Sequence, residues 1–166
     1  MKRSEFIARV AGGAFAVPAA AVGTGLADPQ WPGRLEERSL SGGREMLLDA
    51  AHNPAGASAL ASYLEGETGA KRPLVFAAMR DKDVTGMFTA MLPAVSRLIA
   101  TRASNPRSAE PEALAARARA IAPGLPILVE PVIADALTEA WRHSPRIVVA
   151  GSIFLLGDVL KLLDGT

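Results

Sequence analysis

An apolar run that ends in polar residues is the part of this sequence best suited to chemistry. The run stops at Asp49, and His52 and Asn53 follow after two alanines. Asparagine is a preferred residue at the start of a helix, and Pro54 suits the first helical position. The pattern therefore predicts a strand, a tight turn and a helix, with Asp49 and His52 in the turn. In open parallel α/β sheets, ligands bind at turns of this kind.

Two more segments place polar residues after a predicted strand. Lys82 and Asp83 follow the apolar run that ends at Ala78, where a lysine could offset the charge of a phosphate or carboxylate. Ser152 stands at the start of the last predicted helix, and a hydroxyl at a helix N-terminus suits a carboxylate ligand. Taken alone, a solvated turn explains Lys82, and helix caps explain Asp83 and Ser152.

Five short motifs follow one another along the chain. They are Trp31-Pro32-Gly33-Arg34, Asp49-Ala50-Ala51-His52-Asn53-Pro54, Met79-Arg80-Asp81-Lys82-Asp83, Asn105-Pro106-Arg107 and Ala150-Gly151-Ser152. Their order and spacing resemble the C-terminal domain of folylpolyglutamate synthase/dihydrofolate synthase, in the Mur ligase superfamily. The resemblance runs from about Gly25 to the C-terminus. This chain has Ala50 and Ala78 where that family commonly has glycine.

The resemblance implies a role for several of these side chains. It implies that Arg34 and Asp49 contact ATP held between this domain and a preceding one, and a guanidinium can indeed bind phosphate or stack on a purine. It assigns His52 and Ser152 to the incoming glutamate. Further possible contacts are Asn53, Lys82 and Asp83. Outside the motif, Arg34 would read as a solvated surface residue and Asp49 as a carboxylate that stabilises a turn.

The reaction implied by the resemblance is ATP-dependent amide-bond formation on folate. ATP and magnesium are then the co-substrate and the ion, and glutamate, ATP and folate are the partners. The phosphate loop, the magnesium ligands and the folate pocket belong to the family's N-terminal ATPase domain. None of the four lysines of this chain follows a glycine, so it has no such loop. Three alternatives stay open: a non-catalytic ligand-binding module, a partner of a separately encoded ATPase half, and a fragment without a selected function.

The composition argues against several other classes of function, among them nucleic-acid binding, membrane binding and metal binding. The 166 residues are 49% hydrophobic, enough for one domain with a sizeable core. The net charge of +1 provides no field for nucleic acid or an anionic membrane. Cysteine is absent, which fits a reducing compartment. The two histidines, His52 and His143, lack neighbours at ligand spacing, so no metal site is expected.

The N-terminal segment differs in character from the rest. Residues 1–27 carry Lys2 and Arg3 before an Ala-rich apolar stretch, which makes a secretory signal one interpretation. Glu5 and Arg9 interrupt this stretch, so the first expectation is a cytoplasmic protein without a membrane span. Residues 28–44 are expected to form a linker that carries the Trp-Pro-Gly-Arg motif. The Mur ligase C-terminal-like domain is expected over residues 45–166.

The spacing of apolar residues predicts five βα units in this domain. Strands are expected at Met46–Ala50, Leu74–Ala78, Ser96–Thr101, Ile127–Val129 and Ile147–Ala150, each followed by a helix. This alternation predicts an α/β fold, a single Rossmann-like domain with a mostly parallel sheet flanked by helices. A turn is expected at Ser39–Arg44. Met79, Met87 and Met91 read as core residues, and His143 as a residue that favours a helix C-terminus.

We expect the purified chain to show no ligase turnover alone, because the phosphate loop is missing from its sequence. The measurement is phosphate release with ATP, glutamate and a reduced folate. Glutamate-dependent turnover by the chain alone would contradict this expectation.

Overall fold

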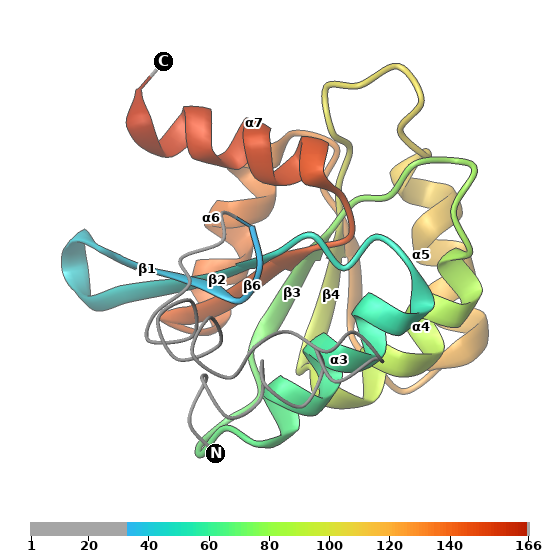
Figure 1. The fold of residues 1–166 in the computed structure, drawn as a ribbon, viewed down its shortest axis with the longest axis horizontal. Coiled ribbons are helices and arrows are strands. Elements are labelled where there is room, and N and C mark those ends of the chain that lie inside the picture. The colour runs from blue at the N-terminus through green and yellow to red at the C-terminus, as the bar shows by residue number, and fades with distance from the viewer. Residues whose placement is uncertain (1–32, 166) are drawn as a thin grey trace, which may run out of the picture.

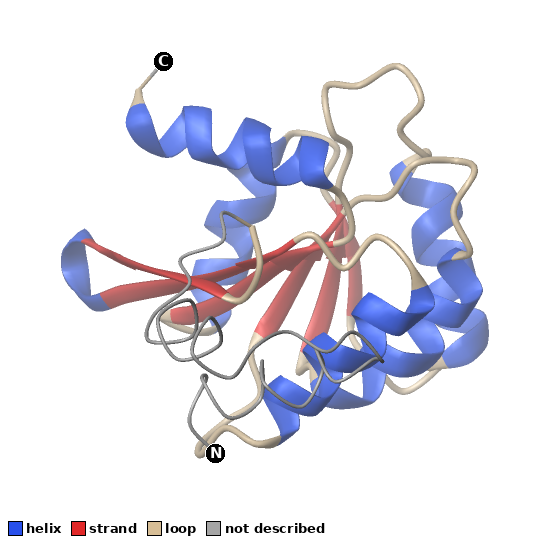
Figure 2. Ribbon diagram, in the orientation of Figure 1, coloured by secondary structure: helices blue, strands red, loops and turns tan. Residues whose placement is uncertain are grey.

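A six-stranded sheet with the strand order β1-β2-β6-β3-β4-β5 forms the centre of the structure, a computed structural model that describes residues 33–165 (Figure 2). The strands are β1 (Glu36–Leu40), β2 (Arg44–Asp49), β3 (Pro73–Phe76), β4 (Arg97–Ala100), β5 (Ile127–Val129) and β6 (Arg146–Ala150). The helices are α3 (Pro54–Glu65), α4 (Val84–Met91), α5 (Pro111–Ile121), α6 (Ile133–His143) and α7 (Ile153–Asp164), with short 3-10 segments η1 (Ser41–Gly43) and η2 (Leu92–Ala94). Strands β2 to β6 pair in parallel, which confirms the predicted fold class.

The helices cover the two faces of the sheet separately. Helices α3, α4 and α5 lie on one face, and α6 and α7 lie on the other (Figure 1). Successive strand residues point to opposite faces, so Leu47 packs with the first group and Met46 with the second. The predicted core methionines are buried on both faces: Met87 and Met91 belong to α4 and pack on the α3 side, and Met79 packs on the α6 side. The buried apolar residues thus form a core on each side of the sheet.

The first strand corrects the prediction for residues 28–44. Glu36–Leu40 pairs antiparallel with β2, so the described part of the predicted linker belongs to the sheet. The predicted turn at Ser39–Arg44 shrinks to η1, because Leu40 pairs with Arg44. Three consecutive charged residues, 36–38, hide this edge strand from an apolar-pattern search.

Two further predictions concern His143 and the N-terminal segment. His143 lies in the last turn of α6, as predicted, and its Nε2 is 2.9 Å from Oε1 of Glu139. The signal-like interpretation of residues 1–27 lies outside the described residues. Among residues 33–165, no helix combines the length and the apolar character of a membrane span.

The five parallel strands end level with one another. In the sheet register, Ala150 of β6 lies opposite both Asp49 of β2 and Phe76 of β3. Phe76 in turn pairs with Ala100, and Ala100 with Val129. The polar segments that follow the strands therefore emerge along one side of the sheet, here called the carboxyl edge. Neighbouring strands β6 and β3 continue into helices on opposite faces, the arrangement that opens a crevice in α/β sheets.

Gly151 occupies the tightest point of this edge. Its φ is +108°, and an added Cβ would lie 2.4 Å from the carbonyl oxygen of Ala77 and 2.4 Å from the Phe76 ring. Glycine is thus required where β6 turns into α7 beside β3.

We expect Gly151→Ala to lower the free energy of unfolding by about 2–4 kcal/mol, because it adds both backbone strain and overpacking. Gly157→Ala is the matched control, since its Cβ would meet nothing within 4 Å in α7. That control should raise stability by up to about 1 kcal/mol through helix propensity. Urea unfolding measures both, and equal stability of the two variants would contradict the packing described here.

Candidate functional site

A single carboxylate ties two separate turns together at the end of β2. Oδ2 of Asp49 accepts the backbone N–H of Leu35 at 2.9 Å, and Oδ1 accepts that of Ala51 at 2.9 Å. The N–H of Ala50 also donates to the carbonyl of Gly33 at 2.7 Å. The predicted Trp-Pro-Gly-Arg motif, as far as it is described, is therefore bound to the strand-to-helix turn that follows β2.

Arg34 and His52 lie on the two turns that the carboxylate of Asp49 joins. Arg34 is exposed and His52 is half-buried. Burial raises the pKa of Asp49, while its backbone N–H donors and the charges of Arg34 and His52 lower it to a lesser extent. Both side chains stand next to a residue whose N–H binds Asp49, because Arg34 precedes Leu35 and His52 follows Ala51. The structure thus brings three predicted site residues into one cluster.

The predicted helix caps at Asn53 and Asp83 are confirmed. Oδ1 of Asn53 accepts the N–H of Gly56 at 2.8 Å, and Oδ1 of Asp83 accepts that of Gly86 at 2.9 Å. A Cβ on Gly86 would lie 2.8 Å from Cγ of Pro54, so the first turns of α3 and α4 lie side by side. Both helices direct their positive ends toward the carboxyl edge. The ligand roles of Asn53 and Asp83 stay predictions.

Ser152 caps α7 on the strand next to Asp49. Its Oγ accepts the N–H of Phe154 at 3.1 Å, and only 3% of the residue is exposed. Because Asp49 pairs with Ala150, Ser152 follows two residues beyond the point where the strands end. A hydroxyl that accepts one bond can still donate its proton. Ser152 is therefore able to both cap the helix and donate to a ligand at this edge.

Lys82 belongs to a second group of charges on the loop after β3. Its Nζ lies 3.6 Å from Oδ2 of Asp81, while Oδ1 of Asp81 accepts a bond from Nη2 of Arg107 at 2.9 Å. The bond from Arg107 is the main reason why the pKa of Asp81 lies below its ordinary value. The structure places Lys82 at the carboxyl edge but on a different loop from Asp49 and Ser152.

Two charged residues that brace this edge were missed by the sequence reasoning. Arg80 donates to the carbonyls of Pro106 and Ser108, at 2.6 and 3.1 Å. Asp158 of α7 accepts bonds from both N and Oγ of Ser104, each at 2.8 Å. Arg80 belongs to the motif Met79-Arg80-Asp81-Lys82-Asp83, which could have indicated it. Asp158 and its partner Ser104 are 54 residues apart, so no local pattern indicates that pair.

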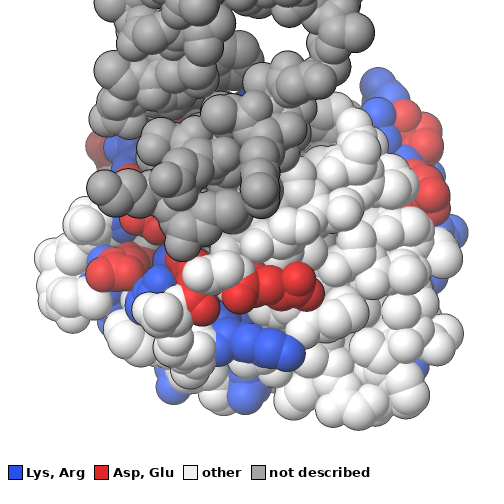
Figure 3. All heavy atoms as spheres, turned by 60° about the horizontal axis from the view of Figure 1, so that its bottom comes forward, with Lys and Arg blue, Asp and Glu red and all other residues white. Residues whose placement is uncertain are grey.

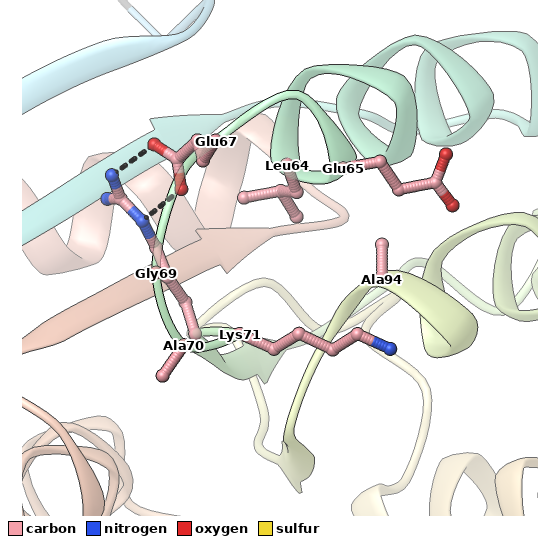
Figure 4. A pocket seen from close by; sticks show the side chains of 8 residues that line it. Leu64, Glu65, Glu67, Gly69, Ala70, Lys71 and Ala94 are labelled. Atoms are coloured by element: carbon pink, nitrogen blue, oxygen red, sulfur yellow. Dashed lines mark hydrogen bonds and ion pairs between the residues drawn. The ribbon is translucent and has the colours of Figure 1, made fainter.

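A pocket of about 200 Å³ lies at the opposite, amino edge of the sheet. It is lined by the end of α3, the segment that leads into β3, and Ala94 of η2, and Leu64 and Ala94 approach it from these separate elements (Figure 4). None of the predicted site residues lines it. Figure 3 looks onto the side of the molecule that is at the bottom of Figure 1, where acidic and basic side chains lie next to one another without a large field of one sign.

Ion pairs next to this pocket serve the fold. The Arg72 side chain is 1% exposed, and its guanidinium binds the carboxylate of Glu67, as the dashed lines in Figure 4 mark. Glu67 also accepts a bond from Nη2 of Arg146 at 3.1 Å, and the hydroxyl of Tyr63 donates to Glu37 at 3.2 Å. The network therefore joins the α3 end to β1, β3 and β6.

Metal ligands do not gather in the described part of the chain. No group of three or more His, Cys, Asp or Glu side chains there is placed to hold a metal ion.

Comparison with known proteins defines the class to which this fold and edge belong. The family profile "Mur ligase, glutamate ligase domain" matches residues 33–156, and the chain belongs to this family. Its relatives within the family are folylpolyglutamate and dihydrofolate synthases. A probable dihydrofolate synthetase of Schizosaccharomyces pombe is 31% identical over 157 residues, which cover 86% of this chain and 36% of the relative.

Solved structures give the same assignment. Mycobacterium tuberculosis folylpolyglutamate synthase complexed with ADP and AMPPCP superposes with a TM-score of 0.75 at 33% identity, over 89% of this chain and 36% of that one. A bifunctional folylpolyglutamate synthase/dihydrofolate synthase with Mn, AMPPNP and L-glutamate bound has a TM-score of 0.74 at 23% identity, which shows the shared fold; the match covers 90% of this chain and 36% of that one. This chain thus spans little more than a third of these relatives.

We expect the ionisation of Tyr63 to report the network at the amino edge. Burial and the charges of Glu37 and Glu67 raise the pKa of Tyr63 from 10.0 to about 12. The unfolded chain therefore loses this proton first, and the free energy of unfolding falls as the pH rises from 10 to about 12. Because the chain has one tyrosine, ultraviolet absorbance at alkaline pH measures its titration alone.

Glu37→Gln should move this midpoint toward the ordinary value, because it removes the charge of Glu37 and replaces a charged hydrogen-bond acceptor with a neutral one. Glu65→Gln, a change on the same helix as Tyr63 and outside the causes of its shift, is the control and should leave the midpoint in place. A midpoint in the folded chain equal to that in urea would contradict the network.

Proposed function

We propose that this chain supplies ATP and glutamate contacts to a ligase of the folylpolyglutamate synthase/dihydrofolate synthase type. One observation carries the proposal. Arg34, Asp49 and His52 lie together at the end of β2, and Ser152 follows the neighbouring strand β6 at the same edge. Side chains able to bind a nucleotide and an amino acid thus stand beside one another where α/β sheets bind ligands.

The nucleotide part of the proposal rests on Arg34 and Asp49. The exposed guanidinium of Arg34 can bind phosphate oxygens in pairs or stack on a purine. Oδ2 of Asp49 accepts the N–H of Leu35, the residue after Arg34, and the carboxylate has lone pairs left for a ribose hydroxyl. The M. tuberculosis relative was solved with ADP and AMPPCP, which supports a nucleotide as the ligand.

The glutamate part rests on His52 and Ser152. The hydroxyl of Ser152 and the positive end of α7 favour a carboxylate. His52, on the neighbouring turn, would orient the same substrate, with Lys82, Asn53 and Asp83 close to the carboxyl edge as further contacts. The structure with Mn, AMPPNP and L-glutamate supports these ligands for the fold.

In the proposed reaction, a folate or pteroate carboxylate oxygen attacks the γ-phosphorus of ATP and ADP leaves. The amine of glutamate then attacks the acyl phosphate carbon, and the amide forms as phosphate leaves and the amine loses a proton. The contribution of this chain is positioning: it holds glutamate and one side of the nucleotide so that the amine can reach the acyl carbon. We assign the phosphate loop and the magnesium ligands to a partner ATPase domain, because the sequence contains no such loop and the described residues form no metal cluster.

Calorimetric titration with ATP–magnesium and with glutamate tests this proposal. We expect Arg34→Ala to weaken ATP binding about 10-fold or more, the usual effect of losing a charged hydrogen bond. Arg142→Ala is the matched control, because Arg142 is an exposed arginine on α6 paired with Glu139. Equal ATP affinity of the two variants and the unchanged chain would count against a nucleotide role for Arg34.

The same titration separates the glutamate site from the ATP site. We expect Ser152→Ala to weaken glutamate binding and leave ATP binding unchanged, with a cost to stability of about 1 kcal/mol from the lost helix cap. Ser62→Ala, at an exposed serine of α3, is the control. A partner domain that carries a phosphate loop is then added. If the chain binds glutamate and ATP but the mixture shows no turnover, the result favours the alternative, a non-catalytic ligand-binding module.

A further inference from the structure

Two residues at the carboxyl edge have a backbone conformation that L-amino acids rarely adopt. Among the described residues, Leu35 with φ 46° and Ala51 with φ 27° are the non-glycine residues with positive φ. Both donate their backbone N–H to the same side chain, one to each carboxylate oxygen of Asp49. One carboxylate thus meets both strained positions, although Leu35 and Asp49 are 14 residues apart.

We propose that Asp49 is a positioning residue, a clamp that holds Leu35 and Ala51 in their left-handed conformations and thereby sets where Arg34 and His52 stand. Arg34 directly precedes one clamped residue, and His52 directly follows the other. This inference rests on the proposed function for its ligands and adds to it a residue that acts through the backbone.

The energies support a clamp of this kind. A residue held in a sparsely populated region costs about 1–3 kcal/mol, and such residues persist only where their surroundings over-determine them. A hydrogen bond to a charged group contributes about 1.5–3 kcal/mol, so two of them can offset the strain at two residues. Leu35 and Ala51 are also 5% and 4% exposed, and both pack into the α3 side of the core. The clamp therefore connects the core to the exposed Arg34.

Direct contact with ATP is the other role proposed above for Asp49, and the two roles predict different effects of the same substitutions. If Asp49 only contacts the nucleotide, its replacement lowers ATP affinity by removing that contact, and a change in backbone strain does not restore it. If Asp49 is a clamp, its replacement lowers ATP affinity because the turns that carry Arg34 and His52 relax. Glycine at position 51 adopts positive φ without strain, so it should replace part of what the clamp does.

The first measurement uses the unchanged chain. The amide proton shifts of Leu35 and Ala51 are followed by NMR as the pH falls through the titration of Asp49. We expect both signals to move with one shared midpoint, above that of an ordinary aspartate because burial raises the pKa of Asp49. Different midpoints, or no movement of either signal, would overturn the clamp.

The second measurement is a rescue experiment. Asp49→Asn leaves one carbonyl oxygen for two N–H donors, so ATP affinity should fall about 10-fold, a loss of about 1.4 kcal/mol. The double variant Asp49→Asn/Ala51→Gly should recover at least a third of that loss on a logarithmic scale. Asp164→Asn, at an exposed residue at the end of α7, is the control and should change nothing.

The outcomes separate the two proposals. A deficit in Asp49→Asn that Ala51→Gly does not reduce would assign Asp49 to direct ATP contact and overturn the clamp as the cause of the affinity. An unchanged chain that binds no ATP would contradict the proposed function, while the shared titration of the two amide protons would still decide whether the clamp exists.

Discussion

The structure depends on the parallel pairing of its last strand, β6, between β2 and β3. Each buried face of β6 contributes to a different core, with Val148 on the α3 side and Ile147 on the α6 side. The pairing with β2 joins residues that are 101 positions apart, and Arg146 reinforces it through its bond to Glu45. Without β6, the two flanking strands would have no common neighbour, and Ser152 would lose its place beside the β2 turn.

Most polar residues at the carboxyl edge have a structural task already. Asn53, Asp83 and Ser152 cap the helices α3, α4 and α7, and Asp49 binds two backbone N–H groups. The caps bring the positive helix ends to one edge, so the interactions that stabilise the fold also create the electrostatic setting for an anionic ligand. A substitution here changes stability and binding together, which is why each binding test needs a matched control and a stability measurement.

The sequence predicted the parallel sheet, its five strands to within two residues at each end, and the three helix caps. Those features rest on local signals: apolar runs, Asn-Pro, and polar residues directly after a strand. The edge strand β1 was missed because residues 36–38 are all charged. Its pairing depends on β2, and no pattern within Glu36–Leu40 reveals that partner.

The candidate site was predictable as a set of positions and not as a set of contacts. The motifs placed Asp49, His52 and Ser152 after strands that meet at one edge, and the family resemblance added Arg34 from the segment before Glu36. They did not indicate that Asp49 binds Leu35 and Ala51, or that Asp158 holds Ser104, because these bonds depend on how separate loops fold toward one another. The network of Tyr63, Glu67, Arg72 and Arg146 escaped prediction for the same reason.

We expect the carboxyl edge, and not the pocket at the amino edge, to bind ATP and glutamate. The measurement is a map of the amide chemical shifts of the isotope-labelled chain during titration with ATP–magnesium and then with glutamate. ATP should shift the amides of residues 33–35 and 49–53, and glutamate should shift those of residues 52 and 151–154. Shifts confined to residues 64–72, which line the amino-edge pocket, or no shifts with either ligand, would contradict it.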